Sequence, residues 1–168
     1  MDSKLRYEIE EQINKELYSA YLYLAMSNYM NSKGFKGISN WLTIQAQEEV
    51  DHAMKFYNFL HDRGETLELK AIDKPEIKWK TVKDVFEKGL NHEKYVTGRI
   101  HKLMDIALEV KDHSASVMLQ WFVTEQVEEE ASFRDILDKL SIFEEDKKYL
   151  MILDSELGKR TRSAPLEQ

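Results

Sequence analysis

The sequence contains no cysteine, and this absence excludes several kinds of chemistry. Disulfide bonds, thiol nucleophiles, zinc–thiolate sites and iron–sulfur clusters all need the cysteine side chain. Proline occurs only twice and glycine only six times among the 168 residues. Because these two residue types interrupt helices, their scarcity allows long continuous helices.

Long hydrophobic runs and clusters of basic residues are also missing. No apolar run approaches the ~20 residues that a membrane-spanning helix needs, and the start at Met1–Arg6 does not resemble a signal peptide. The formal net charge is −7, without a concentration of Lys and Arg. This balance argues against nucleic acid or an anionic membrane as a partner. We therefore expect a cytoplasmic protein that binds neither.

Apolar residues recur at helical spacing in four long segments and one short one. These segments are about residues 3–33, 38–63, 81–110, 114–140 and 144–157. The stretch 65–80 lacks this periodicity, so we expect an extended crossover whose Leu67, Ile72, Ile77 and Trp79 pack against the helices. The pattern predicts an all-α fold: a four-helix bundle over about residues 3–140, with a long crossover between the second and third helices. We expect a short fifth helix and a flexible tail, residues 158–168, within a single domain spanning residues 1–168.

Polar residues interrupt the apolar stripe of the second helix. The segment Ala46-Gln-Glu-Glu-Val-Asp-His52 places Glu49 and His52 three residues apart, on one helix face and one turn from each other. At that spacing the two side chains can bind one metal ion. Glu16 and Glu93 interrupt the apolar stripes of the first and third helices in the same way. Since a bare carboxylate in a core is costly, we expect these groups to meet.

The two halves of the chain match at an offset of 77 residues. The matched pairs are Glu16 with Glu93, Glu49 with Gln126, and His52 with Glu129. Each half is then a helical hairpin that supplies three polar groups to one level of the core. Di-iron and di-manganese carboxylate bundles have this arrangement. The repeat therefore predicts a site for two metal ions.

The donor types narrow the choice of metal. The four negative charges of the glutamates in this repeat balance two divalent cations, and neutral His52 and Gln126 add no charge. These glutamates are Glu16, Glu49, Glu93 and Glu129. Oxygen-rich sites with one imidazole and no thiolate suit iron or manganese, with zinc as a competitor. Only iron(II) among these reacts readily with dioxygen, and two adjacent ions can pass two electrons to one O₂. Glu49, with His52 beside it, is the candidate for the bridging ligand.

Three further glutamates flank the expected ligands, namely Glu48, Glu125 and Glu128. Two metal ions do not require them. They are either residues of a solvated helix face or ligands of an additional cation site that opens to water. The pattern alone leaves both interpretations open.

Several separated motifs resemble those of the non-haem ferritins of bacteria and archaea. They are Asn14-Lys-Glu-Leu-Tyr18, the segment Ala46–His52, and Trp121-Phe-Val-Thr-Glu-Gln-Val-Glu-Glu-Glu130. The resemblance covers nearly the whole chain, including the crossover and the short fifth helix. It implies a ferritin-like fold and a catalytic di-iron centre.

The resemblance also implies a role for each site residue. The ligands implied for one iron are Glu16, Glu49 and His52. Those implied for the second are Glu49, Glu93 and Glu129, with Gln126 close by. A third site would be formed by Glu48, Glu125, Glu128 and Glu129. Tyr23 matches a family tyrosine near the centre, where it hydrogen-bonds a ligand, donates an electron or simply packs in the core.

The function implied is that of an iron-storage ferritin with ferroxidase activity. Iron(II) is oxidised by dioxygen or hydrogen peroxide and stored as ferric oxyhydroxide inside a hollow shell of 24 identical subunits. Haem is not expected, because Val50 occupies the position of the haem-binding methionine of bacterioferritins. Two alternatives remain. One is a discrete di-iron or di-manganese oxidoreductase, of peroxidase or catalase type, that does not mineralise. The other is a structural bundle whose buried glutamates are protonated.

Overall fold

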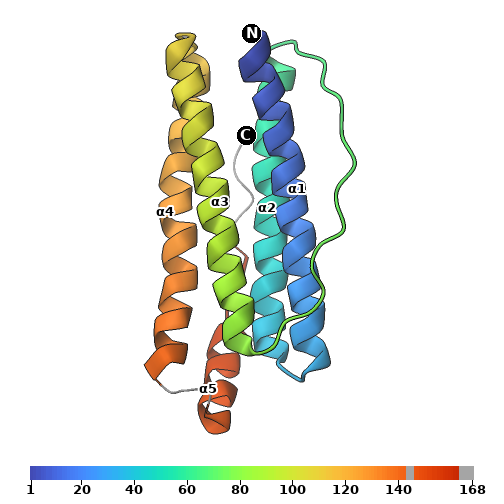
Figure 1. Cartoon of the computed structure of the whole chain (residues 1–168), viewed down its shortest axis with the longest axis vertical. Coiled ribbons are helices and arrows are strands. Elements are labelled where there is room, and N and C mark those ends of the chain that lie inside the picture. The colour runs from blue at the N-terminus through green and yellow to red at the C-terminus, as the bar shows by residue number, and fades with distance from the viewer. Residues whose placement is uncertain (143–145, 163–168) are drawn as a thin grey trace.

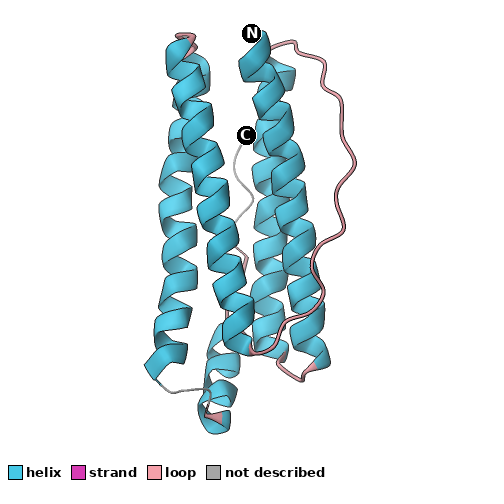
Figure 2. Cartoon of the chain, in the orientation of Figure 1, coloured by secondary structure: helices cyan, strands magenta, loops and turns pink. Residues whose placement is uncertain are grey.

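The computed structural model describes residues 1–142 and 146–162. Its helices are α1 (Ser3–Ser32), α2 (Lys36–Asp62), α3 (Val82–Glu109), α4 (His113–Ile142) and α5 (Lys147–Leu157). These described ranges contain helices and loops but no strand (Figure 2). Within the same ranges, every helix is too short or too polar to cross a membrane. The all-α prediction is confirmed, and the helix ends differ from the expected ones by only a few residues.

The four long helices lie side by side as a bundle (Figure 1). Helix α1 packs against α2 and α3, and α3 packs against α4. The loop after α2 runs along the outside of the bundle to its other end, so α2 and α3 start at the same end (Figure 1). The predicted crossover is therefore present.

Local sequence signals set several of the helix boundaries. Asp2 caps α1, because its side chain accepts hydrogen bonds from backbone N–H groups of the first turn. Thr81 and Asp84 form a comparable cap on α3: the Asp84 backbone N–H donates to Thr81 Oγ1 at 3.0 Å. Gly34 and Gly64 follow α1 and α2 at φ values of +89° and +71°. Glycine adopts this left-handed conformation without steric cost, which lets the chain leave each helix.

The crossover, residues 63–81, packs less completely than its sequence suggested. Trp79 is buried and Leu67 is partly buried, as expected. Ile72 and Ile77 are exposed, so the prediction that they pack against the helices is wrong. The loop is attached to α1 partly through its backbone, since Asn14 Nδ2 donates to the carbonyl oxygen of residue 71 at 3.0 Å. An extended chain turns successive side chains to opposite sides, which leaves some of them in water.

The apolar core is divided into two clusters. One includes Phe86 and Phe133 and extends to α5. The other includes Ile9 and Phe56 and lies toward the N-terminal end of α1. The interrupted stripes of the four long helices lie between them, so polar groups form a layer across the bundle with apolar packing on both sides.

Helix α5 docks on the start of α2 through a close backbone contact. Asp154 Oδ1 accepts a hydrogen bond from the backbone N–H of Ile38 at 2.8 Å. A Cβ atom added to Gly37 would lie 1.7 Å from the backbone oxygen of Asp154. No side chain fits in that space, so only glycine allows α5 to approach this closely.

The chain beyond α5 is described as far as Arg162, and the remainder of the expected flexible tail, residues 163–168, lies outside the described residues. Arg160 Nη2 lies 2.5 Å from Glu48 Oε2, and Arg162 Nη2 lies 2.7 Å from Asp51 Oδ1. For residues 158–162, here called the C-terminal segment, the structure differs from the expected free tail. Two arginine–carboxylate pairs attach it to α2.

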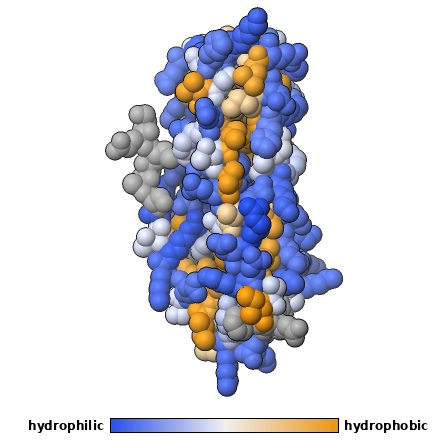
Figure 3. Space-filling model, turned by 90° about the vertical axis from the view of Figure 1, so that its left-hand side faces the viewer, coloured by the Kyte–Doolittle hydropathy of each residue, from blue (hydrophilic) through white to orange (hydrophobic). Residues whose placement is uncertain are grey.

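A narrow hydrophobic stripe runs along the side of the bundle that faces left in Figure 1, between hydrophilic side chains (Figure 3). Exposed apolar residues of α4 include Val117 and Val127, which are 73% and 64% exposed. On α5, Met151 is 72% exposed. A continuous apolar stripe, unlike single exposed apolar side chains, is a feature of surfaces that contact another protein.

The contact between Gly37 and Asp154 yields a stability prediction. Gly37→Ala forces α5 away from α2, so we expect a lower midpoint of thermal unfolding and faster hydrogen exchange in α5. Gly98→Ala is the matched control, because a Cβ there meets open space and alanine favours a helix by about 1 kcal/mol. Equal unfolding midpoints for the two variants would contradict the proposed role of Gly37.

Candidate metal centre

The polar layer contains all six residues of the internal repeat. Each is buried, with at most 6% of its surface exposed. The residues are Glu16 of α1, Glu49 and His52 of α2, Glu93 of α3, and Gln126 and Glu129 of α4. Every long helix therefore contributes, because its apolar stripe carries polar groups at this level.

Glu16, Glu49 and His52 form the first group able to hold a cation. One potential ligand atom from each lies within 4.8 Å of the others, and His52 Nδ1 is 3.7 Å from Glu49 Oε2. Glu16 Oε2 and Glu49 Oε1 are buried, and no hydrogen-bond donor among the described residues reaches them. Buried carboxylate oxygens without a donor are costly. A divalent cation bound by these oxygens and the imidazole satisfies both, so the donor set fits a metal ion.

Glu93 is held by its neighbours. Tyr23 donates its hydroxyl proton to Glu93 Oε1, and Gln126 Nε2 donates to Glu93 Oε2 at 3.1 Å. Glu93 belongs to neither of the groups of described residues whose ligand atoms lie within 4.8 Å. The structure thus places Tyr23 and Gln126 beside one expected ligand but does not gather Glu49, Glu93 and Glu129 around a single point.

A second group lies on the other side of His52. His52, Glu125 and Glu129 also bring one potential ligand atom each within 4.8 Å, and His52 Nε2 is 3.9 Å from Glu125 Oε1. Among the described residues, Glu48 and Glu128 are outside both groups. The Glu48 carboxylate pairs with Arg160, and Glu128 is exposed. Two of the four residues expected at a third site are therefore brought together.

Burial raises the pKa of each carboxyl group in the layer. Burial has the largest effect on Glu49, whose pKa lies well above its usual value, and nearby Glu93 and Glu16 raise it further. The pKa of Glu129 is also well above its usual value, because of burial and then Glu93 and Glu49. For Glu93, burial raises the pKa to about 7 against the opposing hydrogen bonds from Tyr23 and Gln126. Repulsion between neighbouring carboxylates is thus the second cause, after burial, of the raised pKa values of Glu49 and Glu129.

Two buried glutamines complete the layer, and the sequence pattern did not predict a role for them. Gln12 Nε2 donates to Glu16 Oε1 at 2.8 Å, and Gln45 Nε2 donates to Glu129 Oε2 at 2.5 Å. Each glutamine lies four residues before a glutamate of the layer, on the same helix face. That four-residue spacing is the feature of the sequence that could have indicated a role for the two glutamines.

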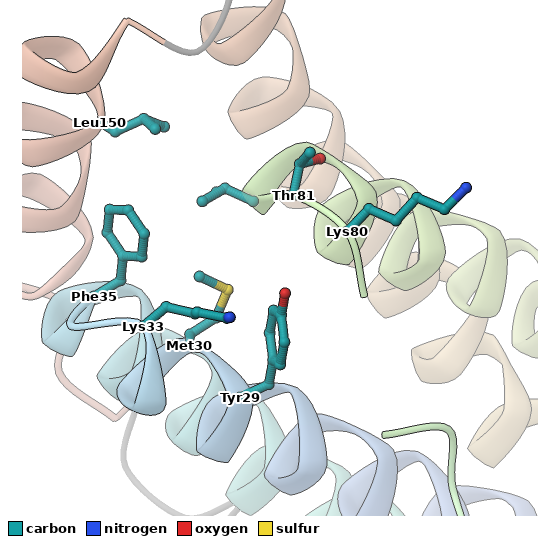
Figure 4. Close-up of a pocket in the computed structure, with 8 residues that line it drawn as sticks. Tyr29, Met30, Lys33, Phe35, Lys80, Thr81 and Leu150 are labelled. Atoms are coloured by element: carbon teal, nitrogen blue, oxygen red, sulfur yellow. The ribbon is translucent and has the colours of Figure 1, made fainter. Parts of the chain in front are cut away.

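A pocket on the described surface is remote from this layer. It has a volume of about 320 Å³ and lies between the end of α1, the start of α3 and α5 (Figure 4). Its lining includes Tyr29, Lys80 and Leu150 but no carboxylate or imidazole. The pocket therefore lacks the donors that a metal centre needs.

Comparisons with known proteins agree over nearly the full length. A family model for the ferritin-like domain matches residues 8–143. A probable bacterial non-heme ferritin-like protein of Haemophilus influenzae is 40% identical over 156 residues, which cover 93% of this chain and 94% of that protein. A bacterial non-heme ferritin of Staphylococcus aureus is 36% identical over 153 residues, covering 91% and 92% of the two chains.

Solved structures give the same result. An engineered closed form of the Archaeoglobus fulgidus ferritin has a TM-score of 0.95 and 45% identity, and the match covers 97% of this chain and 99% of that one. An open-pore ferritin of the same archaeon has a TM-score of 0.94 and 46% identity, with 96% and 98% covered. The helical architecture described above is thus shared almost completely with these proteins.

The raised pKa values predict how the stability of the metal-free protein depends on pH. A carboxyl group whose folded-state pKa exceeds its unfolded-state pKa stabilises the fold while it is protonated. For Glu93 that contribution is complete below about pH 4.5 and is lost as the pH rises to about 7. The free energy of unfolding should fall by about 3 kcal/mol over this range. Thermal unfolding of metal-free protein should therefore show a falling midpoint between pH 5 and pH 7.

Glu93→Gln provides the control for that prediction. Glutamine has a similar shape and no titratable group, so the fall in the midpoint should be smaller in this variant. A midpoint that rises across the same pH range in the metal-free wild type would show that the layer is not held protonated.

Proposed function

Because the chain belongs to the ferritin family, we propose that it is an iron-storage protein that oxidises iron(II) at the metal centre in its polar layer. The observation that carries this proposal is the buried group of Glu16, Glu49 and His52, in which two carboxylate oxygens receive no hydrogen bond from any described residue. The substrate is iron(II), and the electron acceptor is dioxygen or hydrogen peroxide. We propose that the whole chain acts as a single ferritin-like domain in the cytoplasm.

The residues of the layer have distinct proposed roles. Glu16, Glu49 and His52 bind one iron(II), and Glu49 also reaches the second. Glu93 and Glu129 hold that second ion, so that Glu49 bridges the pair. Each iron(II) gives up one electron, so a pair supplies the two electrons that, with two protons, reduce one O₂ to hydrogen peroxide. The four carboxylates lose their protons when the cations bind, since the cations remove their mutual repulsion.

Tyr23 and Gln126 are proposed to orient Glu93. Both donate hydrogen bonds to its carboxylate. A ligand held in this way needs little rearrangement when a cation arrives, which favours binding. The stacked contact between Tyr23 and Phe133, with ring centroids 5.7 Å apart, fixes the tyrosine in turn.

Glu125 is proposed to belong to an outer cation position. It is half-buried, lies close to His52 and Glu129, and has a pKa raised by burial. We propose that iron passes through this position between the centre and the storage space. Glu48 and Glu128 are proposed to assist once the cation is present.

We propose that 24 copies of the chain form a hollow shell in which ferric oxyhydroxide is stored. The exposed apolar side chains of α4 and α5, among them Val117, Val127 and Met151, support burial against other subunits. The Archaeoglobus fulgidus relatives, described as open-pore and closed forms, support an assembly with openings.

The shared ligand supplies the first test. Glu49→Ala should reduce the rate of iron(II) oxidation on the order of 100-fold or more, because it removes a metal ligand from both proposed iron positions. The same change removes a repelled carboxylate, so the metal-free variant should unfold at an equal or higher temperature. Stopped-flow absorbance in air, together with calorimetry, measures both effects. Unchanged oxidation kinetics would exclude Glu49 as a ligand.

Glu125→Ala is the matched comparison. It leaves Glu16, Glu49 and His52 in place, so the rate of the first oxidation, of two irons per subunit, should equal that of the wild type. Later turnover should change, because iron no longer has this position available. Multiple-turnover assays with successive additions of iron(II) separate the two phases. Wild-type kinetics of Glu125→Ala in both phases would contradict the proposed outer cation position.

A further inference from the structure

Arg160 reaches the metal centre from outside the bundle. It belongs to the C-terminal segment that follows α5, yet its guanidinium lies against α2, with CZ 4.5 Å from the centroid of the Trp41 ring. Arg160 Nη1 donates to Gln45 Oε1 at 2.9 Å. Gln45, which is fully buried, donates through Nε2 to Glu129 Oε2. A continuous hydrogen-bonded path therefore joins the C-terminal segment to Glu129.

The chemistry of the two side chains fixes the direction of this path. A guanidinium has only donors, so it can face only the carbonyl oxygen of the Gln45 amide. The amide NH₂ must then point the other way, toward Glu129. Without Arg160 the amide oxygen loses this partner, and the hydrogen bond to Glu129 alone would have to hold the Gln45 side chain in place.

The opposite side of the layer contains a path of the same kind. Arg99 Nε donates to Gln12 Oε1 at 2.8 Å, and Gln12 donates to Glu16 Oε1. The other oxygen of Glu16, Oε2, receives no hydrogen bond within the part of the chain that the structure describes. An arginine–glutamine pair thus occupies one carboxylate oxygen and leaves the second for a cation.

We propose that Arg160 is a positioning residue of the metal centre, acting through Gln45 on Glu129. Gln45 holds Oε2 of Glu129 and so orients the carboxylate, as Gln12 does for Glu16. The C-terminal segment is then part of the construction of the site, although it supplies no ligand. This inference rests on the proposed metal centre and adds a residue to it.

The test is a cation titration that does not depend on iron oxidation. Metal-free protein is titrated with Co²⁺, and binding is followed by visible absorption and by calorimetry. In the wild type we expect two tight steps per subunit. Loss of one step in Glu129→Ala identifies the position that Glu129 serves. Arg160→Ala should weaken that step roughly 10- to 100-fold, the range found when a partner of a metal ligand is removed, and leave the other step unchanged.

Arg162→Ala is the matched control. Arg162 is in the same segment and pairs with Asp51, so its loss should leave both steps as in the wild type. Gln45→Leu tests the path from its other end while keeping the pair between Arg160 and Glu48. It should weaken the same step, and it keeps the proposal testable if Arg160→Ala does not fold.

The double variant decides whether Arg160 acts through Gln45. If it does, adding Arg160→Ala to Gln45→Leu weakens Co²⁺ binding no further. A further loss of the same size would mean that Arg160 acts by another contact, such as Glu48, and would overturn the proposal. Unchanged Co²⁺ steps in Arg160→Ala would overturn it as well. If wild-type protein shows no tight Co²⁺ step, the metal centre itself fails, and this inference fails with it.

Discussion

Four carboxyl groups buried at one level of a helical bundle repel one another, and the remaining architecture accommodates that repulsion. Glu16, Glu49, Glu93 and Glu129 are each almost inaccessible to water, where charge–charge interactions are strong. Arg99 and Arg160 do not pair with these carboxylates directly but reach them through a glutamine amide. The two guanidinium groups therefore lie beyond the glutamines and do not neutralise the four carboxylates by direct ion pairs.

Apolar packing on both sides of the polar layer stabilises the bundle despite the repulsion between the carboxylates. The cluster around Phe86 and Phe133 lies on one side and the cluster around Ile9 and Phe56 on the other. Both clusters consist mainly of apolar side chains packed between helices, which do not titrate. The bundle can thus remain folded while the carboxylates change protonation or bind cations. Packing on both sides also holds the side chains of the layer at nearly fixed positions, which would favour binding of the proposed cations.

The centre could be predicted from the sequence to the extent that it depends on helix periodicity. Burial of Glu16 and Glu93 follows from their places on apolar stripes, and the 77-residue offset brings the halves to one level. Contacts made by distant segments could not be predicted in this way. Arg160 meets Glu48 because α5 docks on Gly37, a fit that depends on backbone approach and leaves no periodic pattern. The exposure of Ile72 likewise depends on the path of an irregular loop.

The most direct test of the proposed storage function is the amount of iron that the protein retains. Metal-free protein would be given excess iron(II) in air and separated by size, and the iron in the protein peak would be counted per subunit. An iron-storage shell would be a very large particle whose iron content per subunit far exceeds the two ions proposed for the centre. Two irons per subunit on a small particle would contradict it and would indicate a discrete di-metal enzyme that shares only the bundle with the storage proteins.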